Sequence, residues 1–123
     1  MDKLELRAGV GRTLVNLSSS YMGNDLLVLI YNKQAHIGAV AVADYDHKEH
    51  RTSVSVITRL GHKDDAIARK AAHQINKQTK KPVCVIAGIH LDNITDDEIK
   101  QLVENSDKLV TMFLQEADKS WAV

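Results

Sequence analysis

Three short clusters hold the side chains of this sequence that are best suited to bind a ligand. His36 lies two residues before Gly38, residues 61–65 read Gly-His-Lys-Asp-Asp, and residues 88–93 read Gly-Ile-His-Leu-Asp-Asn. Imidazole, carboxylate and amide groups can hydrogen-bond a polar ring system, and glycine lets a backbone approach a ligand closely. Each cluster lies where we expect a strand or helix to begin or end, and binding sites are commonly built at such ends.

The middle cluster is a candidate phosphate site because it directly precedes a predicted helix. Free backbone N–H groups and the helix dipole attract anions to a helix start, Gly61 and His62 lie next to that start, and Lys63 adds a positive charge. The competing interpretation is that Gly61 only makes the turn. Asp64 and Asp65 would then stabilise the helix start, and their carboxylates would repel a phosphate. The sequence leaves both interpretations open.

The third cluster follows an apolar strand and offers groups for a polar ring. His90, Asp92 and Asn93 can hydrogen-bond such a ring, and Gly88 would leave room for a flat ligand against the strand. Alternatively, Asp92 and Asn93 only shape the turn before Thr95, as these residue types commonly do. For His90, which follows an otherwise apolar strand, the sequence favours a binding role.

The first cluster opens a strand of small residues. Ala39, Ala41 and Ala43 follow His36 and Gly38 on one strand face. Small side chains admit a ligand, a partner subunit or a closely packed helix, and helix packing is the commonest of these. We nevertheless expect the three clusters to line one pocket, because histidine lies close to glycine at an element end in each of them.

Metal binding and catalysis have weaker support. Zinc accepts three histidine ligands plus water, and Asp92 is a further possible ligand, but no close pair such as His-x-x-x-His supports a metal site. Cys84 lies in a strand that we expect to be buried, where a thiol is usually inert. We therefore predict a protein that is not an enzyme and holds no metal.

Composition limits the remaining functions. The 16 acidic and 16 basic residues cancel, so the sequence shows no basic surface for nucleic acid or an anionic membrane. No run approaches the roughly 20 apolar residues that a membrane span requires. One cysteine excludes a disulfide framework, and the first residues lack the apolar stretch of a signal peptide. We expect one soluble, cytoplasmic domain over residues 1–123.

Apolar residues in the first half of the sequence follow the pattern of strands. Alternating or continuous apolar runs predict five strands, at about residues 3–8, 12–19, 26–31, 37–43 and 52–59. Residues 22–25, Met-Gly-Asn-Asp, supply a hairpin turn, and a polar loop over 44–50 joins the last two strands. We expect the five strands to form an antiparallel meander.

The apolar period then becomes helical. A first helix begins near Asp64 and ends before Pro82, with Ile67, Ala68, Ala71, Ala72 and Ile75 on its inward face. Residues 83–89 form a continuous apolar strand. A last helix over 95–116 begins with a capping box of Thr95 and Glu98 and a staple of Ile94 against Ile99. Its inward face comprises Ile99, Leu102, Val103, Val110, Phe113 and Leu114, and we expect residues 118–123 to be a frayed tail.

The order β-β-β-β-β-α-β-α predicts an α+β fold. We expect a two-layer sandwich in which two helices cover one face of a mainly antiparallel sheet of about six strands. Such a sheet leaves its edge strands unpaired, and unpaired edges favour association with another chain. We therefore expect a homodimer.

Three strings of the sequence resemble the prenylated flavin chaperones, the family of the small D subunit of gallate decarboxylase. They are residues 36–41, 61–65 and 87–95, and the resemblance extends from about Leu4 to Leu114. The organisation is more distantly similar to proteasome assembly chaperone 4. The resemblance implies a non-catalytic accessory protein that binds prenylated FMN, or its precursor, and delivers it to a client decarboxylase.

The clusters supply the candidate residues for binding that cofactor, namely His36, Gly38, Gly61, His62, Lys63, Gly88, His90, Asp92 and Asn93. Two other functions remain open. One is a protein–protein assembly chaperone with no small-molecule ligand, and the other is a small metal-dependent enzyme that uses the histidines.

Overall fold

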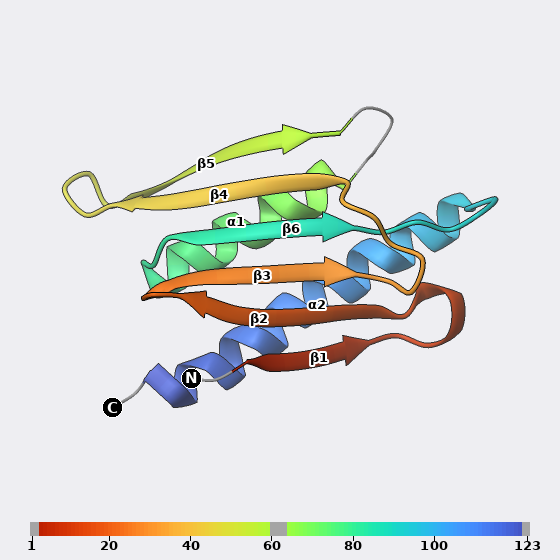
Figure 1. Ribbon diagram of the computed structural model, residues 1–123, viewed down its shortest axis with the longest axis horizontal. Helices are drawn as coiled ribbons and strands as arrows, with labels where there is room; N and C mark the ends of the chain where they lie inside the picture. Colours follow the sequence, from red (N-terminus) through yellow and green to blue (C-terminus); the bar gives the residue numbers. More distant parts are fainter. Residues whose placement is uncertain (1–2, 60–63, 122–123) are drawn as a thin grey trace.

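The apolar patterns of the sequence form a sheet and two long helices (Figure 1). The structure, a computed structural model, describes residues 3–59 and 64–121, with side chains up to residue 117. Within these ranges the elements are β1 (Leu4–Ala8), the 3₁₀ helix η1 (Gly11–Thr13), β2 (Val15–Met22), β3 (Asp25–Tyr31), β4 (Ala39–Asp46), β5 (Arg51–Thr58), α1 (Asp65–Thr79), β6 (Val83–Gly88) and α2 (Asp96–Trp121).

The six strands form one mixed sheet in the order β1-β2-β3-β6-β4-β5. The last strand, β6, pairs parallel with β3 and antiparallel with β4, and the other neighbours pair antiparallel. The α+β class and the mainly antiparallel sheet are thus confirmed, but the five-strand meander is wrong. Strand β6 lies between β3 and β4 and pairs with both, so these two strands are not neighbours in the sheet.

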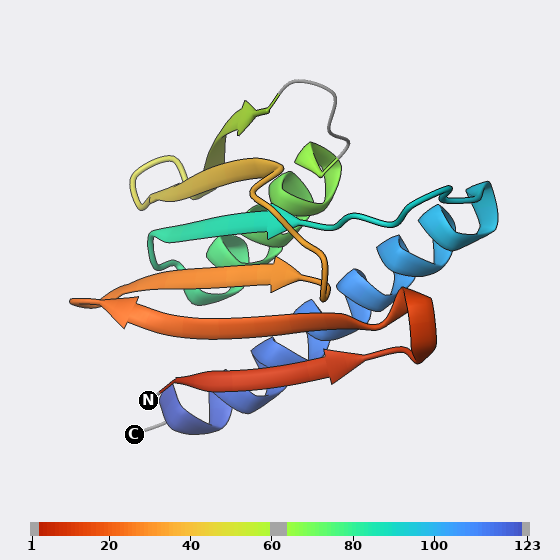
Figure 2. The same cartoon turned by 45° about the vertical axis from the view of Figure 1, so that its right-hand side comes forward.

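Both helices cover the same face of the sheet (Figures 1 and 2). Helix α1 packs on β4, β5 and β6, and α2 packs on β1 and β2. The stripe of small residues in β4 serves close helix packing, since its alanines and those of α1 are all buried: Ala39, Ala41, Ala43, Ala68, Ala71 and Ala72. No helix in the described part of the chain is long and apolar enough to cross a membrane.

Several predicted boundaries shift. Strand β2 begins at Val15 because the chain first makes the 3₁₀ turn η1, and α2 continues to Trp121, past the predicted end at 116 and into the predicted tail. No glycine or proline lies between 116 and 121 to end the helix.

The predicted hairpin is present, with Met22 paired to Asp25 and Gly23 at a φ of 61°, where glycine carries no steric cost.

Three residues that the helical pattern assigned to the inward faces lie at the margin of the core. Ile67 of α1 and Ile99 of α2 are only partly buried, and Val103 of α2 is 37% exposed. For α2 the reason is visible in Figure 1: the first turns of this helix extend past the ends of β3 and β6, where no sheet covers them. Apolar side chains of both helices are therefore not fully covered by the sheet and can line a binding site.

Phe113 tests the packing of α2 on the sheet. Its side chain is fully buried, so Phe113→Ala is expected to lower the free energy of unfolding by about 3–5 kcal/mol. Val103→Ala is the control on the same helix and should cost less, because this side chain is partly exposed. Denaturant unfolding measures both, and a loss below about 1 kcal/mol at Phe113 would contradict this packing.

The sheet has two edge strands, β1 and β5, and the homodimer stays a prediction. Light scattering at high protein concentration should return a mass near twice 13.7 kDa, because unpaired edges favour association. A mass of 13.7 kDa at every concentration tested would refute self-association.

Candidate functional site

The position of β6 forces the chain to cross the end of this strand between β3 and β4. Residues 32–38 make the crossing, and Gly38 N–H donates to the carbonyl of Ala87 at 2.9 Å. A Cβ on Gly88 would overlap the carbonyl oxygen of His36, and a Cβ on Gly38 would overlap the carboxylate of Asp64. Gly88 thus makes room for a crossing backbone, where we had expected it to make room for a flat ligand.

Asn32 fixes the start of the segment that follows β6. Its buried side chain donates from Nδ2 to the carbonyl of His90 at 2.8 Å and accepts at Oδ1 from the N–H of His90 at 3.1 Å. The amide group thereby takes the place that the backbone of a neighbouring strand would occupy. Asn32 could not be selected from the sequence, because a polar residue after an apolar strand is common.

Two of the three predicted clusters meet at this crossing. The ring centroids of His36 and His90 lie 5.4 Å apart, with the ring planes inclined by 40°. On its other side, Nε2 of His90 lies 3.0 Å from Oδ1 of Asp92, close enough for an ion pair when the imidazole is protonated. The crossing thus places two imidazoles side by side at one end of the sheet.

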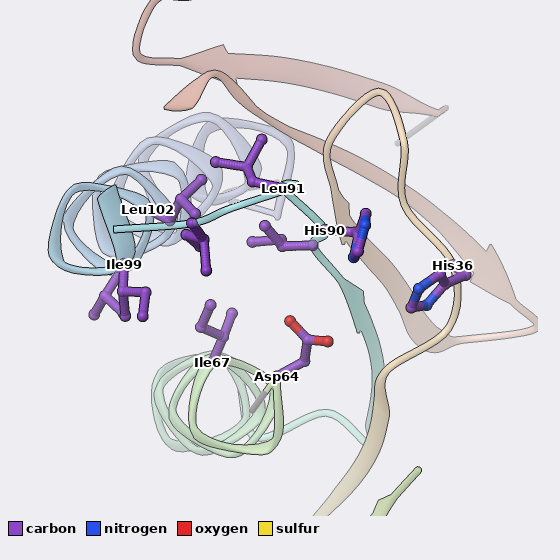
Figure 3. A pocket seen from close by; sticks show the side chains of 10 residues that line it. His36, Asp64, Ile67, His90, Leu91, Ile99 and Leu102 are labelled. Atoms are coloured by element: carbon purple, nitrogen blue, oxygen red, sulfur yellow. The ribbon is translucent and has the colours of Figure 1, made fainter. Parts of the chain in front are cut away.

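A groove of about 420 Å³ opens beside these histidines, between the first turns of α1 and α2 (Figure 3). Its wall is mainly aliphatic: Ile67 from α1, Ile99, Leu102 and Val103 from α2, and Ile89, Leu91 and Ile94 from the connecting segment. The polar part of the wall consists of His36, Asp64 and His90. The volume lies within the range of about 300–1,000 Å³ for small-molecule sites. The groove can hold an apolar ligand that has polar groups along one edge.

Arg12 ties the segment after β6 to the start of α2. Its Nε donates to Oε2 of Glu98 at 2.7 Å, and its Nη2 donates to the carbonyl of Asp92 at 2.8 Å. The predicted capping box is confirmed, because Thr95 N–H donates to Glu98 Oε1 and Glu98 N–H donates to Thr95 Oγ1, both at 3.1 Å. The segment is therefore held by Asn32 at one end and by Arg12 at the other.

The ionised state of Glu98 is strongly favoured. The hydrogen bond from Arg12, followed by that from the backbone of Thr95, lowers the pKa of Glu98 to about 2. Arg12 in turn has a raised pKa, chiefly because of its hydrogen bond to Glu98. The contact is thus an ion pair at neutral pH.

The other predicted site residues have different positions. Asp92 contacts His90 but lies outside the groove lining, and Asn93 has a φ of 54°, which fits a turn former. The candidates at 61–63 lie outside the described residues. Among the described residues, no group of three His, Cys, Asp or Glu side chains could hold a metal ion.

Two features of the site are not predictable from the sequence patterns. Asp64 has the position of a helix-start residue, yet it is only 6% exposed and lines the groove. Arg12 is an isolated arginine in a turn, which carries no signal for a contact that is distant in sequence. The helical residues of the wall were expected to pack on the sheet, and Ile94 and Ile89 were expected in the staple and in the apolar strand.

The pKa of Glu98 leads to a prediction about acid stability. A folded-state pKa of about 2, below the ordinary 4.5, means that ionised Glu98 stabilises the fold above pH 4.5 and that this contribution is lost as the pH falls from 4.5 to about 2. Urea unfolding at several pH values should show a difference between wild type and Glu98→Gln that shrinks over this interval.

The Arg12→Gln background is the control for that measurement. Without the guanidinium, the difference between Glu98 and its glutamine variant should depend less on pH, because the main cause of the lowered pKa is gone. An equal difference at about pH 6 and about pH 2 in the wild-type background would contradict the ion pair.

Comparison with known proteins places the chain in a family. A search of curated proteins gives no match. A solved structure, titled "Crystal Structure of a Novel Chaperone Complex for Yeast 20S Proteasome Assembly", is similar at a TM-score of 0.62, with 17% identity over 97% of this chain and 98% of that chain. At this identity the likeness shows the fold alone. The model of the prenylated flavin chaperone LpdD-like domain matches residues 9–118, so the chain belongs to this family.

Proposed function

We propose that this protein binds prenylated FMN, or its flavin precursor, in the groove and delivers it to a client decarboxylase without catalysing a reaction itself. The observation that carries the proposal is the aliphatic groove with His36, Asp64 and His90 at its polar part. Membership in the prenylated flavin chaperone family supports the same cofactor.

The chemistry of the groove suits a prenylated flavin. A flavin is a flat ring system with carbonyl and N–H groups along one edge, and prenylation adds hydrocarbon. Seven aliphatic side chains can bury the hydrocarbon, which contributes roughly 25 cal/mol per Å² of apolar surface removed from water. His36, Asp64 and His90 can hydrogen-bond the polar edge.

The groove also suits a protein that must release its ligand. Ile94 and Val103 are 40% and 37% exposed, so one side of the wall faces solvent. A ligand bound there without a covalent bond keeps part of its surface accessible to a second protein. Delivery then requires only that the client bind the cofactor more tightly.

A fluorescence titration with FMN tests the groove. Wild type should bind FMN saturably, and Ile67→Glu should weaken binding by at least about tenfold, because the new charge would have to be desolvated by the ligand. Ile57→Glu is the matched control: Ile57 is 74% exposed on β5, outside the groove. Absence of saturable binding, or equal effects of the two variants, would contradict the proposal.

A transfer assay tests the delivery step. The apo form of a prenylated-flavin-dependent decarboxylase should gain activity faster from cofactor preincubated with wild type than from cofactor preincubated with Ile67→Glu. Equal rates would show that binding in the groove does not serve delivery.

A second candidate function is a protein–protein assembly chaperone without a small ligand. One observation favours it: the sheet face opposite the helices exposes apolar side chains, with Val42 50% and Ile57 74% exposed. Exposed apolar patches often mark protein-binding sites. Retained association with a client, together with no binding of FMN or prenylated FMN, would favour this function over the first.

A further inference from the structure

A second cavity shares a wall with the groove. It has a volume of about 330 Å³, and both cavities are lined by His90 and Leu91. The crossing segment contributes Asn32, Lys33 and Gln34 to its wall, and η1 contributes Gly11 and Arg12. The segment after β6 therefore separates an aliphatic groove from a smaller cavity of different chemistry.

The smaller cavity is basic. Among the described residues that line it, Arg12 and Lys33 are cations and none is a carboxylate. Arg12 donates from Nε and Nη2 to the carboxylate of Glu98, and Nη2 also donates to the backbone carbonyl of Asp92. Its Nη1 remains as a further donor. Lys33 is exposed, and its ammonium group makes no hydrogen bond or ion pair with the described residues. A fixed guanidinium and an available ammonium group form a suitable pair of donors for an anion.

We propose that this basic cavity binds the phosphate of a flavin mononucleotide whose ring system occupies the adjacent groove, with Lys33 and Arg12 as the charged donors. The inference rests on the proposed function and names the residues that would distinguish a phosphorylated flavin from an unphosphorylated one. His90 lines both cavities, at the place where the ribityl chain would pass from the ring to the phosphate.

This location differs from the phosphate site predicted from the sequence. That site used Gly61, His62 and Lys63 before α1, and the helix there begins with the carboxylates of Asp64 and Asp65. Carboxylates at a helix start occupy the favourable potential that a phosphate would use. None of the described residues that line the basic cavity is a carboxylate. Glu98 pairs with Arg12 from outside this lining, and Lys33 supplies the unpaired positive charge.

Parallel titrations with FMN and riboflavin test the proposal, because the two ligands share the ring system and differ in the phosphate. Wild type should bind FMN about tenfold more tightly than riboflavin at low salt, as one charge-assisted hydrogen bond would produce, and the preference should shrink as salt is added. Lys33→Gln should remove most of this preference and leave riboflavin affinity unchanged.

Two further variants test whether the effect depends on charge inside the basic cavity. Gln34→Glu adds a negative charge to the cavity and should weaken FMN binding without affecting riboflavin. Lys108→Gln removes an exposed lysine of α2 that lines neither cavity and should change neither affinity.

Three outcomes would overturn the inference. Equal affinity of wild type for FMN and riboflavin would show that the phosphate is not recognised. A loss of the FMN preference in Lys63→Gln, with Lys33→Gln unaffected, would place the phosphate at the start of α1. Failure of both ligands to bind would overturn the proposed function together with this inference, whereas the first two outcomes leave flavin binding intact.

Discussion

The insertion of β6 between β3 and β4 is the constraint on which the site depends. It makes residues 32–38 cross the end of β6, and the crossing brings His36 next to His90. The missing side chain of Gly88 lets the carbonyl of His36 pass. An antiparallel meander would have joined β3 to β4 directly, without any crossing over β6. The two histidines thus meet because of the strand order.

The features predicted correctly from the sequence depend on neighbours in the chain. The two-residue hairpin at Gly23, the capping box of Thr95 and Glu98 and the buried alanines of α1 each follow from a pattern a few residues long. The position of β6 depends on which distant strand it pairs with, and strands with similar apolar patterns do not specify that choice locally. The prediction of a five-strand meander was wrong for this reason.

The same distinction applies to the candidate site. His36 and His90 could be selected by residue type and by their position at element ends. The groove wall could not, because Ile67 and Val103 have the spacing of core residues. Ile67 is nevertheless only partly buried, and Val103 is partly exposed because α2 extends beyond the sheet. Arg12 and Glu98 are 86 residues apart, so no sequence window contains both.

The amide bridge between Asn32 and His90 has a consequence for folding. It joins residues 58 positions apart, so the chain closes a long loop before either histidine reaches its place. The hairpin of β2 and β3 can form early because its contacts are local, whereas loop closure of this length is slow and entropically costly. A nascent chain therefore cannot place His36 beside His90 until its last strand has entered the sheet. A ligand that binds only after this step stabilises the completed fold and no earlier intermediate.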